Sequence, residues 1–193
     1  MSKRHSSGAP GQPTQMASSA ANGQPSTITY TISAYAQKLA HDWHSLVDRG
    51  ANGTVAGGDM RDVYNHGTKT NVAGFDNHTV NDLPLMATGA YTRSNRGPCI
   101  ILIGQAARSG IGHSILSTGQ LEHFGCAIED KSSVLTGKQP TITSPDGQYV
   151  FPLAFRQGLP YIRMRPYTDD EFDKLPKVWL TSTDTWDPAC LEM

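Results

Sequence analysis

Several short stretches of the chain alternate hydrophobic and polar residues, which is the period of a half-buried β-strand. The clearest is residues 27–33, where Thr and Ser alternate with Ile and Tyr, and residues 161–165 alternate in the same way. Residues 99–103 are instead continuously apolar and rich in β-branched side chains, as in a central strand buried on both faces. A further apolar run, residues 45–47, stops at a polar turn. These patterns predict a mostly β domain.

Two hairpins are predicted from strand-like segments joined by turn residues. Residues 71–75 and 79–86 flank a polar turn, and Pro84 favours an edge position because proline has no N–H to donate. Residues 141–143 and 148–151 flank a Ser-Pro-Asp-Gly sequence, in which proline fixes φ and glycine accepts positive φ. We expect both hairpins to belong to the same β domain.

Helical patterns are few and short. Tyr35, Leu39 and Trp43 recur at i, i+4 and i+8, which predicts a short helix over residues 34–44. Ser117 and Gln120 have the spacing of a capping box, in which each side chain satisfies the other residue's backbone amide, so a helix should follow Ser117. Gly125 is placed to end that helix in the left-handed conformation.

The chain divides by composition into three parts. Residues 1–26 are almost all small or polar and offer too little apolar surface to offset the entropy of ordering, so we expect a flexible N-terminal arm. Residues 27–165 form the β domain. Residues 166–193 read as a C-terminal extension of surface segments with scattered anchors.

Charge and composition disfavour several kinds of partner. Sixteen Lys and Arg against 17 Asp and Glu give a net charge of −1, so no basic field attracts nucleic acid. No apolar run is long enough for a bilayer or a secretory signal, which predicts a soluble, intracellular, cytoplasmic protein without a membrane partner. Cys99, Cys126 and Cys190 have no metal-binding spacing and are expected to be small, buried or half-buried thiols.

The candidate chemistry centres on Asp48-Arg49-Gly50-Ala51-Asn52, where an apolar strand enters a tight turn. With Leu46 and Val47 before it, this segment resembles the signature of retroviral-type aspartic proteases. Residues 115–121, Ile-Leu-Ser-Thr-Gly-Gln-Leu, resemble the strand-to-helix segment that follows the catalytic loop in copia-type retrotransposon polyproteins. The hairpin from Thr141 and residues 158–161 resemble the end of that protease region, so the likeness spans most of residues 28–165.

The resemblance implies a retropepsin-like closed β-barrel or sandwich with one short α-helix. It also implies an aspartic endopeptidase, a hydrolase that processes a polyprotein, with Asp48 as its catalytic residue and without a cofactor. A chain of this length carries one such Asp, so a second copy completes the site and a homodimer is expected. A polypeptide substrate would lie between the aspartates and a flap from each subunit. The flap candidates are Gly74, Phe75, Asp76, Asn77 and His78.

Arg49 departs from the family pattern, which has Ser or Thr at this position. The small hydroxyl both donates and accepts in the hydrogen bonds that hold the two loops together, whereas a guanidinium only donates. Two cations beside two aspartates would also lower the pKa of the pair. We therefore expect reduced or altered activity, and Arg49→Ser should raise cleavage of an unstructured substrate.

Other interpretations remain open. Asp48 could be an ordinary turn aspartate, and the domain a non-catalytic interaction module or polyprotein fragment left from a degenerate element. His41 and His44 have a metal-compatible spacing but no second cluster, so no metal is expected, and His113 and His123 are expected at the surface. Residues 104–112 superficially resemble a phosphate loop. They lack the glycine and lysine pattern of a nucleotide site and are better explained as an exposed connection.

Overall fold

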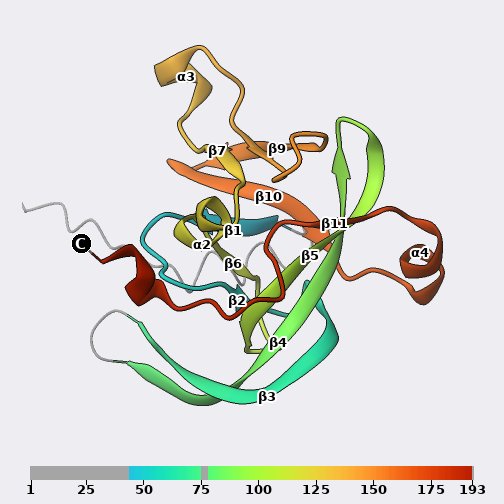
Figure 1. Cartoon of the computed structure of the whole chain (residues 1–193). Helices are drawn as coiled ribbons and strands as arrows, with labels where there is room; N and C mark the ends of the chain where they lie inside the picture. The colour runs from blue at the N-terminus through green and yellow to red at the C-terminus, as the bar shows by residue number, and fades with distance from the viewer. Residues whose placement is uncertain (1–43, 75–77, 193) are drawn as a thin grey trace, which may run out of the picture. The chain divides into compact units, whose positions relative to one another are not determined.

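The computed structural model describes residues 44–74 and 78–192. This part of the chain is mostly β, with eleven strands, three short α-helices and one 3-10 turn (Figure 1). The strands are β1 (His44–Asp48), β2 (Val55–Ala56), β3 (Arg61–Ala73), β4 (Thr79–Ser94), β5 (Gly97–Arg108), β6 (Ile115–Ser117), β7 (Ala127–Glu129), β8 (Thr141–Thr143), β9 (Val150–Arg156), β10 (Leu159–Arg165) and β11 (Lys177–Trp179). The helices are α2 (Thr118–His123), α3 (Ser133–Thr136) and α4 (Asp169–Lys174), and η2 (Pro188–Leu191) is the 3-10 turn.

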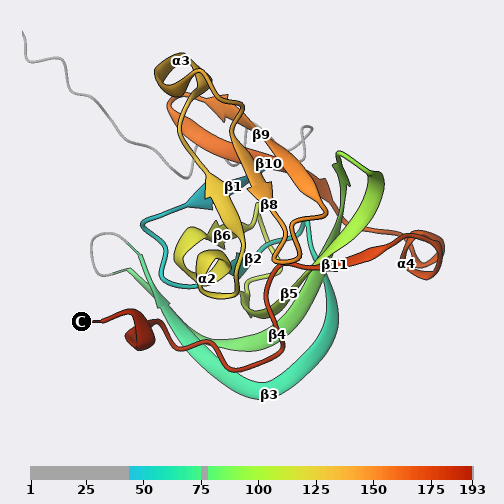
Figure 2. The ribbon, with the colours of Figure 1, turned by 45° about the horizontal axis from the view of Figure 1, so that its top comes forward.

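The strands form one large mixed sheet in the order β3-β4-β5-β2-β6-β1-β10-β9-β8-β7, with β11 paired to β5. An additional pairing of β4 with β10 brings the two ends of the run β4-β5-β2-β6-β1-β10 together, so these strands make a partial ring. Three pairings are parallel, namely β1 with β6, β2 with β5 and β5 with β11. Figure 2 shows β8, β9 and β10 gathered together, and α3 lies within the connection between β7 and β8.

The core is built around β5, as its apolar sequence predicts. Cys99, Ile100, Ile101, Leu102 and Ile103 are all at most 3 % exposed. They pack with side chains from β1, β6, β9 and β10 and with Leu121 of α2. Burial raises the pKa of Cys126 to about 12 and also raises the pKa of Cys99, so both thiols stay protonated near neutral pH. Cys190 is exposed, which corrects the expectation that all three thiols are at least half-buried.

The hairpin predicted around residue 77 is real but much longer than predicted. It joins β3 to β4, and its register runs from Arg61 opposite Gly89 to Ala73 opposite Thr79. Its length is not evident from the sequence, because much of β3 and β4 consists of polar and small residues without hydrophobic alternation. Pro84 lies one residue beyond the last pair between β4 and β5, Leu85 with Ala107, so no pairing to β5 needs its missing amide.

The hairpin over residues 141–151 is confirmed as β8 and β9, with Thr143 opposite Val150 and Gly147 at φ 71°. The strand predicted over residues 161–165 is confirmed as β10. Residues 27–33 and 34–43 of the predicted N-terminal strand and helix, and the arm over residues 1–26, lie outside the described residues. His44, the last residue of that predicted helix, instead begins β1.

The C-terminal segment is mostly exposed with scattered buried anchors, as predicted, and it also adds the strand β11 to the sheet. Val178 on β11 lies opposite Ile101, and Leu180 is fully buried. The amide of Gly104 donates to the Thr181 hydroxyl at 2.7 Å, and a side chain at position 104 would collide with the backbone of Ser182. The expectation of a single short helix is also corrected, because α3 and α4 accompany α2.

Candidate functional site

Asp48 is the last residue of β1, partly buried, and it stands at the start of an exposed loop. Its Oδ1 accepts a hydrogen bond from the Gly50 amide at 2.8 Å. A Cβ atom at position 50 would lie 3.3 Å from the same oxygen, so glycine lets the backbone fold back onto the carboxylate. Within residues 44–74 and 78–192, the other carboxylate oxygen has no hydrogen-bond donor.

The loop after Asp48 is held from behind by the Ser-Thr-Gly-Gln segment at the start of α2. β1 and β6 are parallel, and Asp48 lies opposite Ser117. The Ser117 hydroxyl donates to the Ala51 carbonyl at 2.7 Å, and the Ser117 amide donates to the Thr54 hydroxyl at 3.2 Å. The two motifs that carry the family resemblance therefore meet in space.

Gln120 completes this support, and its role differs from the predicted capping box. The Ser117 side chain does accept from the Gln120 amide, and Gly125 after the helix has φ 94°, as predicted. The Gln120 side chain instead accepts from the Thr54 amide at 3.0 Å and donates to the Gln105 carbonyl at 2.8 Å. Gln120 is fully buried, so its side chain provides the hydrogen bonds that the Thr54 amide and the Gln105 carbonyl would otherwise need from water.

Arg49 is bound on the outside of the loop by two carboxylates. Its guanidinium makes a two-pronged contact with Glu122 of α2, both distances 3.0 Å, and its Nε donates to Asp130 at 2.9 Å. The hydrogen bond to Glu122, followed by that to Asp130, raises the pKa of Arg49. The sequence suggested that Arg49 would add an uncompensated positive charge beside Asp48. In the structure, Glu122 and Asp130 of the same chain neutralise Arg49, whose side chain is 56 % exposed.

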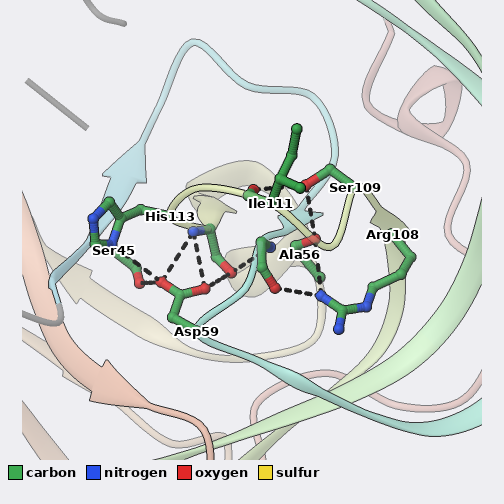
Figure 3. Close-up of polar contacts among 9 residues, drawn as sticks. Ser45, Ala56, Asp59, Arg108, Ser109, Ile111 and His113 are labelled. Carbon is green, nitrogen blue, oxygen red and sulfur yellow. Dashed lines mark hydrogen bonds and ion pairs between the residues drawn. The ribbon is translucent and has the colours of Figure 1, made fainter. Parts of the chain in front are cut away.

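A second aspartate, Asp59, lies behind the same strands and is fully buried (Figure 3). Its carboxylate accepts from the hydroxyls of Ser45 and Ser114 and, at 3.0 and 3.1 Å, from the Ser114 amide. Nδ1 of His113 lies 3.7 Å from Asp59 and has no hydrogen-bond partner among the described residues. The cluster ties the loop before β3 to the start of β1 and to the segment before β6.

Arg108 and Ser109 fix the neighbouring turn at Ala56 and Gly57 (Figure 3). The Arg108 guanidinium donates to the Gly57 carbonyl, and the Ser109 hydroxyl donates to the Ala56 carbonyl at 3.1 Å. A side chain at position 57 would lie 2.5 Å from the Gly112 carbonyl oxygen, so glycine is required for this close approach. The segment between β2 and β3 is therefore fixed against the end of β5 and the loop that follows it.

A pocket of about 360 Å³ extends from the loop after Asp48 to the long hairpin. One wall is residues 52–55, and the opposite wall is residues 69–73 of β3. Trp186 of the C-terminal segment also lines it and donates from its indole to the Asn52 carbonyl at 2.8 Å. Gln105 holds Trp186 through two hydrogen bonds, of 2.9 and 3.2 Å, with the tryptophan's backbone.

Two of the flap candidates, Gly74 and His78, lie beside the ends of β3 and β4. The Gly74 amide donates to the His78 carbonyl at 2.7 Å, which closes the turn between β3 and β4. Phe75, Asp76 and Asn77 lie outside the described residues. The wall formed by residues 69–73 leads directly to this turn.

Sequence reasoning missed Asp59, the two partners of Arg49 and the tryptophan that covers the loop. The only local signal for Asp59 is the pair of glycines before it, which indicates a crowded turn but not a buried carboxylate. His113 was expected at the surface, yet only 13 % of its side chain is exposed. His123 is exposed, as expected.

The structure also bears on the phosphate-loop interpretation and on metal binding. β5 continues to Arg108, so the first residues of the supposed loop form a strand, and the Gly104 amide is already bound to Thr181. Among the described residues, no group of three His, Cys, Asp or Glu side chains could hold a metal ion, while His41 lies outside them. No helix in the described part of the chain is long and apolar enough to cross a membrane.

Comparison with protein-family models, curated proteins and solved structures finds no match for this chain. What the site does is therefore inferred from its geometry and from the motif resemblance.

Proposed function

We propose that this protein is an aspartic endopeptidase in which Asp48 from each of two identical chains forms the catalytic pair. The observation that carries the proposal is a partly buried aspartate at the end of β1, followed by a loop that Ser117 braces and that lines, from Asn52 onward, a pocket shared with the long hairpin. The substrate would be a polypeptide, and the motif resemblance favours a polyprotein of the copia-type retrotransposon class. The partial ring of strands would then be a form of the closed retropepsin-like barrel.

A single chain offers one half of the required chemistry. Peptide hydrolysis by two carboxylates needs both within reach of one water. One carboxylate takes the water's proton while the other, already protonated, donates to the carbonyl oxygen of the scissile bond. The resulting tetrahedral species collapses when the amine leaves with a proton. Asp59 cannot serve as the second carboxylate because it is fully buried behind the loop.

The exposed side of the loop is suited to meeting a second copy. Arg49, Gly50 and Asn52 are exposed, whereas Ser117, Gln120 and Thr54 on the inner side are buried. A two-fold pairing places the same surface of both chains in contact. It would bring the two Asp48 carboxylates together, so that they share one proton and titrate as a pair.

The pocket between loop and hairpin supplies a place for substrate side chains. Its walls combine the loop backbone with Leu85 and Trp186, a mixture of polar and apolar groups that suits an extended peptide. The long hairpin would cover the bound peptide as the flap.

The test is cleavage of an unfolded peptide library from pH 3 to 7, with Asp48→Asn as the matched inactive variant. Activity that Asp48→Asn abolishes, together with a dimer in sedimentation analysis, supports the proposal. Equal inactivity of the two folded proteins would reject it.

One observation favours the alternative of a non-catalytic interaction module. Arg49 occupies the position where the resemblance calls for a hydroxyl that holds two loops together, and its guanidinium donates three hydrogen bonds to Glu122 and Asp130 of its own chain. A monomer at high concentration would favour the module, because a lone Asp48 has no second carboxylate.

A further inference from the structure

A second pocket, of about 380 Å³, lies where β4, β9 and β10 meet. Three of its lining residues are Arg93, Arg163 and Arg165, and none is acidic. We call it the arginine pocket. No residue lines both this pocket and the one beside the Asp48 loop.

Strand pairing gathers the three arginines. Arg163 and Arg165 are two residues apart on β10 and so project from the same face of the sheet. β10 pairs with β4 through Met164 opposite Thr92, and the Thr92 hydroxyl donates to the Arg163 carbonyl at 2.7 Å. Arg93, the next residue on β4, is thereby held beside the other two. Like charges so close on one sheet face are destabilising unless something neutralises them.

Among residues 44–74 and 78–192, a carboxylate neutralises only one of the three guanidiniums. Arg165 bonds Glu171, with one contact at 2.9 Å, and lies 3.8 Å from the centre of the Tyr91 ring. Arg93 and Arg163 are exposed, and within residues 44–74 and 78–192 their guanidiniums contact no acceptor. The preceding residues 1–43 contain a single acidic residue, Asp42, and more bases than acids. Residues 75–77, which also lie outside the described residues, contain Asp76, so the two segments together have two acidic side chains against three Lys and Arg.

We propose that the arginine pocket binds a phosphate monoester. Each guanidinium presents a planar fork of N–H donors that matches two oxygens of an anion. A phosphate monoester carries nearly two negative charges and three acceptor oxygens, enough to bind the guanidiniums of both Arg93 and Arg163. A single carboxylate could pair with only one of them. The pocket is also larger than a phosphate group, and Tyr91 and Pro152 offer surface for the organic part of the ester.

The ester could be a small molecule or a phosphorylated side chain of a polypeptide, and the test separates these sources. The full chain is titrated with phenyl phosphate, with a short neutral peptide carrying phosphotyrosine, and with the same peptide unphosphorylated, while backbone amide resonances are followed. Both phosphate probes should shift residues 91–93 and 163–165, and the unphosphorylated peptide should not. Binding of the phosphopeptide at least ~10-fold tighter than phenyl phosphate identifies a polypeptide ligand, and equal affinity identifies a small ester.

Two double variants with the same change in charge test the site itself. Arg93→Gln with Arg163→Gln should weaken phenyl phosphate binding by about 10-fold or more, because charge-assisted hydrogen bonds are lost. Lys131→Gln with Lys138→Gln removes two exposed cations elsewhere and should leave the affinity unchanged. Equal weakening in both double variants, or shifts confined to other residues, would overturn the proposal. Since neither pair lies in the Asp48 loop, this result is independent of the cleavage test.

Discussion

Two aspartates lie close to β1 and β6 in the fold, Asp48 at the end of β1 and Asp59 bonded to Ser45 of β1 and to Ser114 just before β6, and their surroundings differ sharply. Asp48 accepts one hydrogen bond in the described part of the chain and is partly buried at the start of an exposed loop. Asp59 is fully buried and accepts from two hydroxyls and a backbone amide. Both oxygens of the Asp59 carboxylate accept hydrogen bonds, so this side chain has a structural role. Asp48, in contrast, keeps one carboxylate oxygen without a hydrogen-bond donor among residues 44–74 and 78–192.

The sharpest way to test this comparison is to remove the charge of Asp48. Asp48→Asn keeps an oxygen for the Gly50 amide, so the free energy of unfolding should change little. Cleavage should fall by about 10²-fold or more, the range for loss of a general acid or base. Peptide cleavage and urea denaturation of the same preparation measure the two effects. A large loss of stability would instead place Asp48 with the structural carboxylates.

Asp59→Ala should have the opposite profile. Removing a buried carboxylate leaves Ser45, Ser114 and the Ser114 amide without their acceptor, and we expect the free energy of unfolding to fall by about 3 kcal/mol. Asp173→Ala, at an exposed position on α4, is the matched control and should change stability by less than ~0.5 kcal/mol. Urea denaturation measures both. Equal stability of the two variants would contradict the structural role.

Gln120 tests whether the second motif supports the first. Gln120→Leu keeps the volume but leaves the Thr54 amide and Gln105 carbonyl unpaired, at a cost of about 2 kcal/mol. Gln120→Glu keeps an acceptor for the Thr54 amide and, when its carboxyl is protonated at acidic pH, also an O–H donor for the Gln105 carbonyl, so at acidic pH it should be milder. Hydrogen exchange at Thr54 reports the local effect. Unchanged exchange in Gln120→Leu would show that the loop is held by other contacts.

Arg49 separates a contact within one chain from one between chains. Arg49→Ser removes a largely exposed ion cluster, so stability should fall by only about 1 kcal/mol, while the new hydroxyl should raise cleavage. Arg49→Lys also loses the two-pronged geometry but adds no hydroxyl. It should match the stability loss without the gain in cleavage. A gain in both variants would mean that the guanidinium itself, not the missing hydroxyl, limits activity.

The smallest expected effect is on the stability of the fold at acidic pH. Cleavage measured at acidic pH must be corrected for any loss of folded protein. The hydrogen bond from Arg165 lowers the pKa of Glu171 to about 2, below its ordinary value of 4.5. A group with a lowered folded pKa stabilises above its unfolded pKa, and that contribution is lost as pH falls from 4.5 toward 2. Thermal unfolding of the wild type and Glu171→Gln from pH 2 to 7 should show curves that converge at the acid end. A constant gap between them would rule out this titration.

The elements predicted well are those whose pattern is local. The apolar run at residues 99–103 became the buried centre of β5, and the Ser-Pro-Asp-Gly turn joined β8 to β9. The β3–β4 hairpin was underestimated because most of β3 is exposed and polar, so no apolar alternation marks its length. β11 was missed because only one of its three residues, Val178, is buried.

The sequence alone determined the mostly β character, the turn at Asp48 and the helix start at Ser117, because backbone propensity, glycine and capping chemistry act over a few residues. Only the tertiary structure decided which polar groups meet across long separations. It placed Gln120 against Thr54, Glu122 and Asp130 against Arg49, and Ser45 and Ser114 against Asp59. A buried or paired polar group is defined by its partner, and strand order, which no local pattern encodes, chooses that partner.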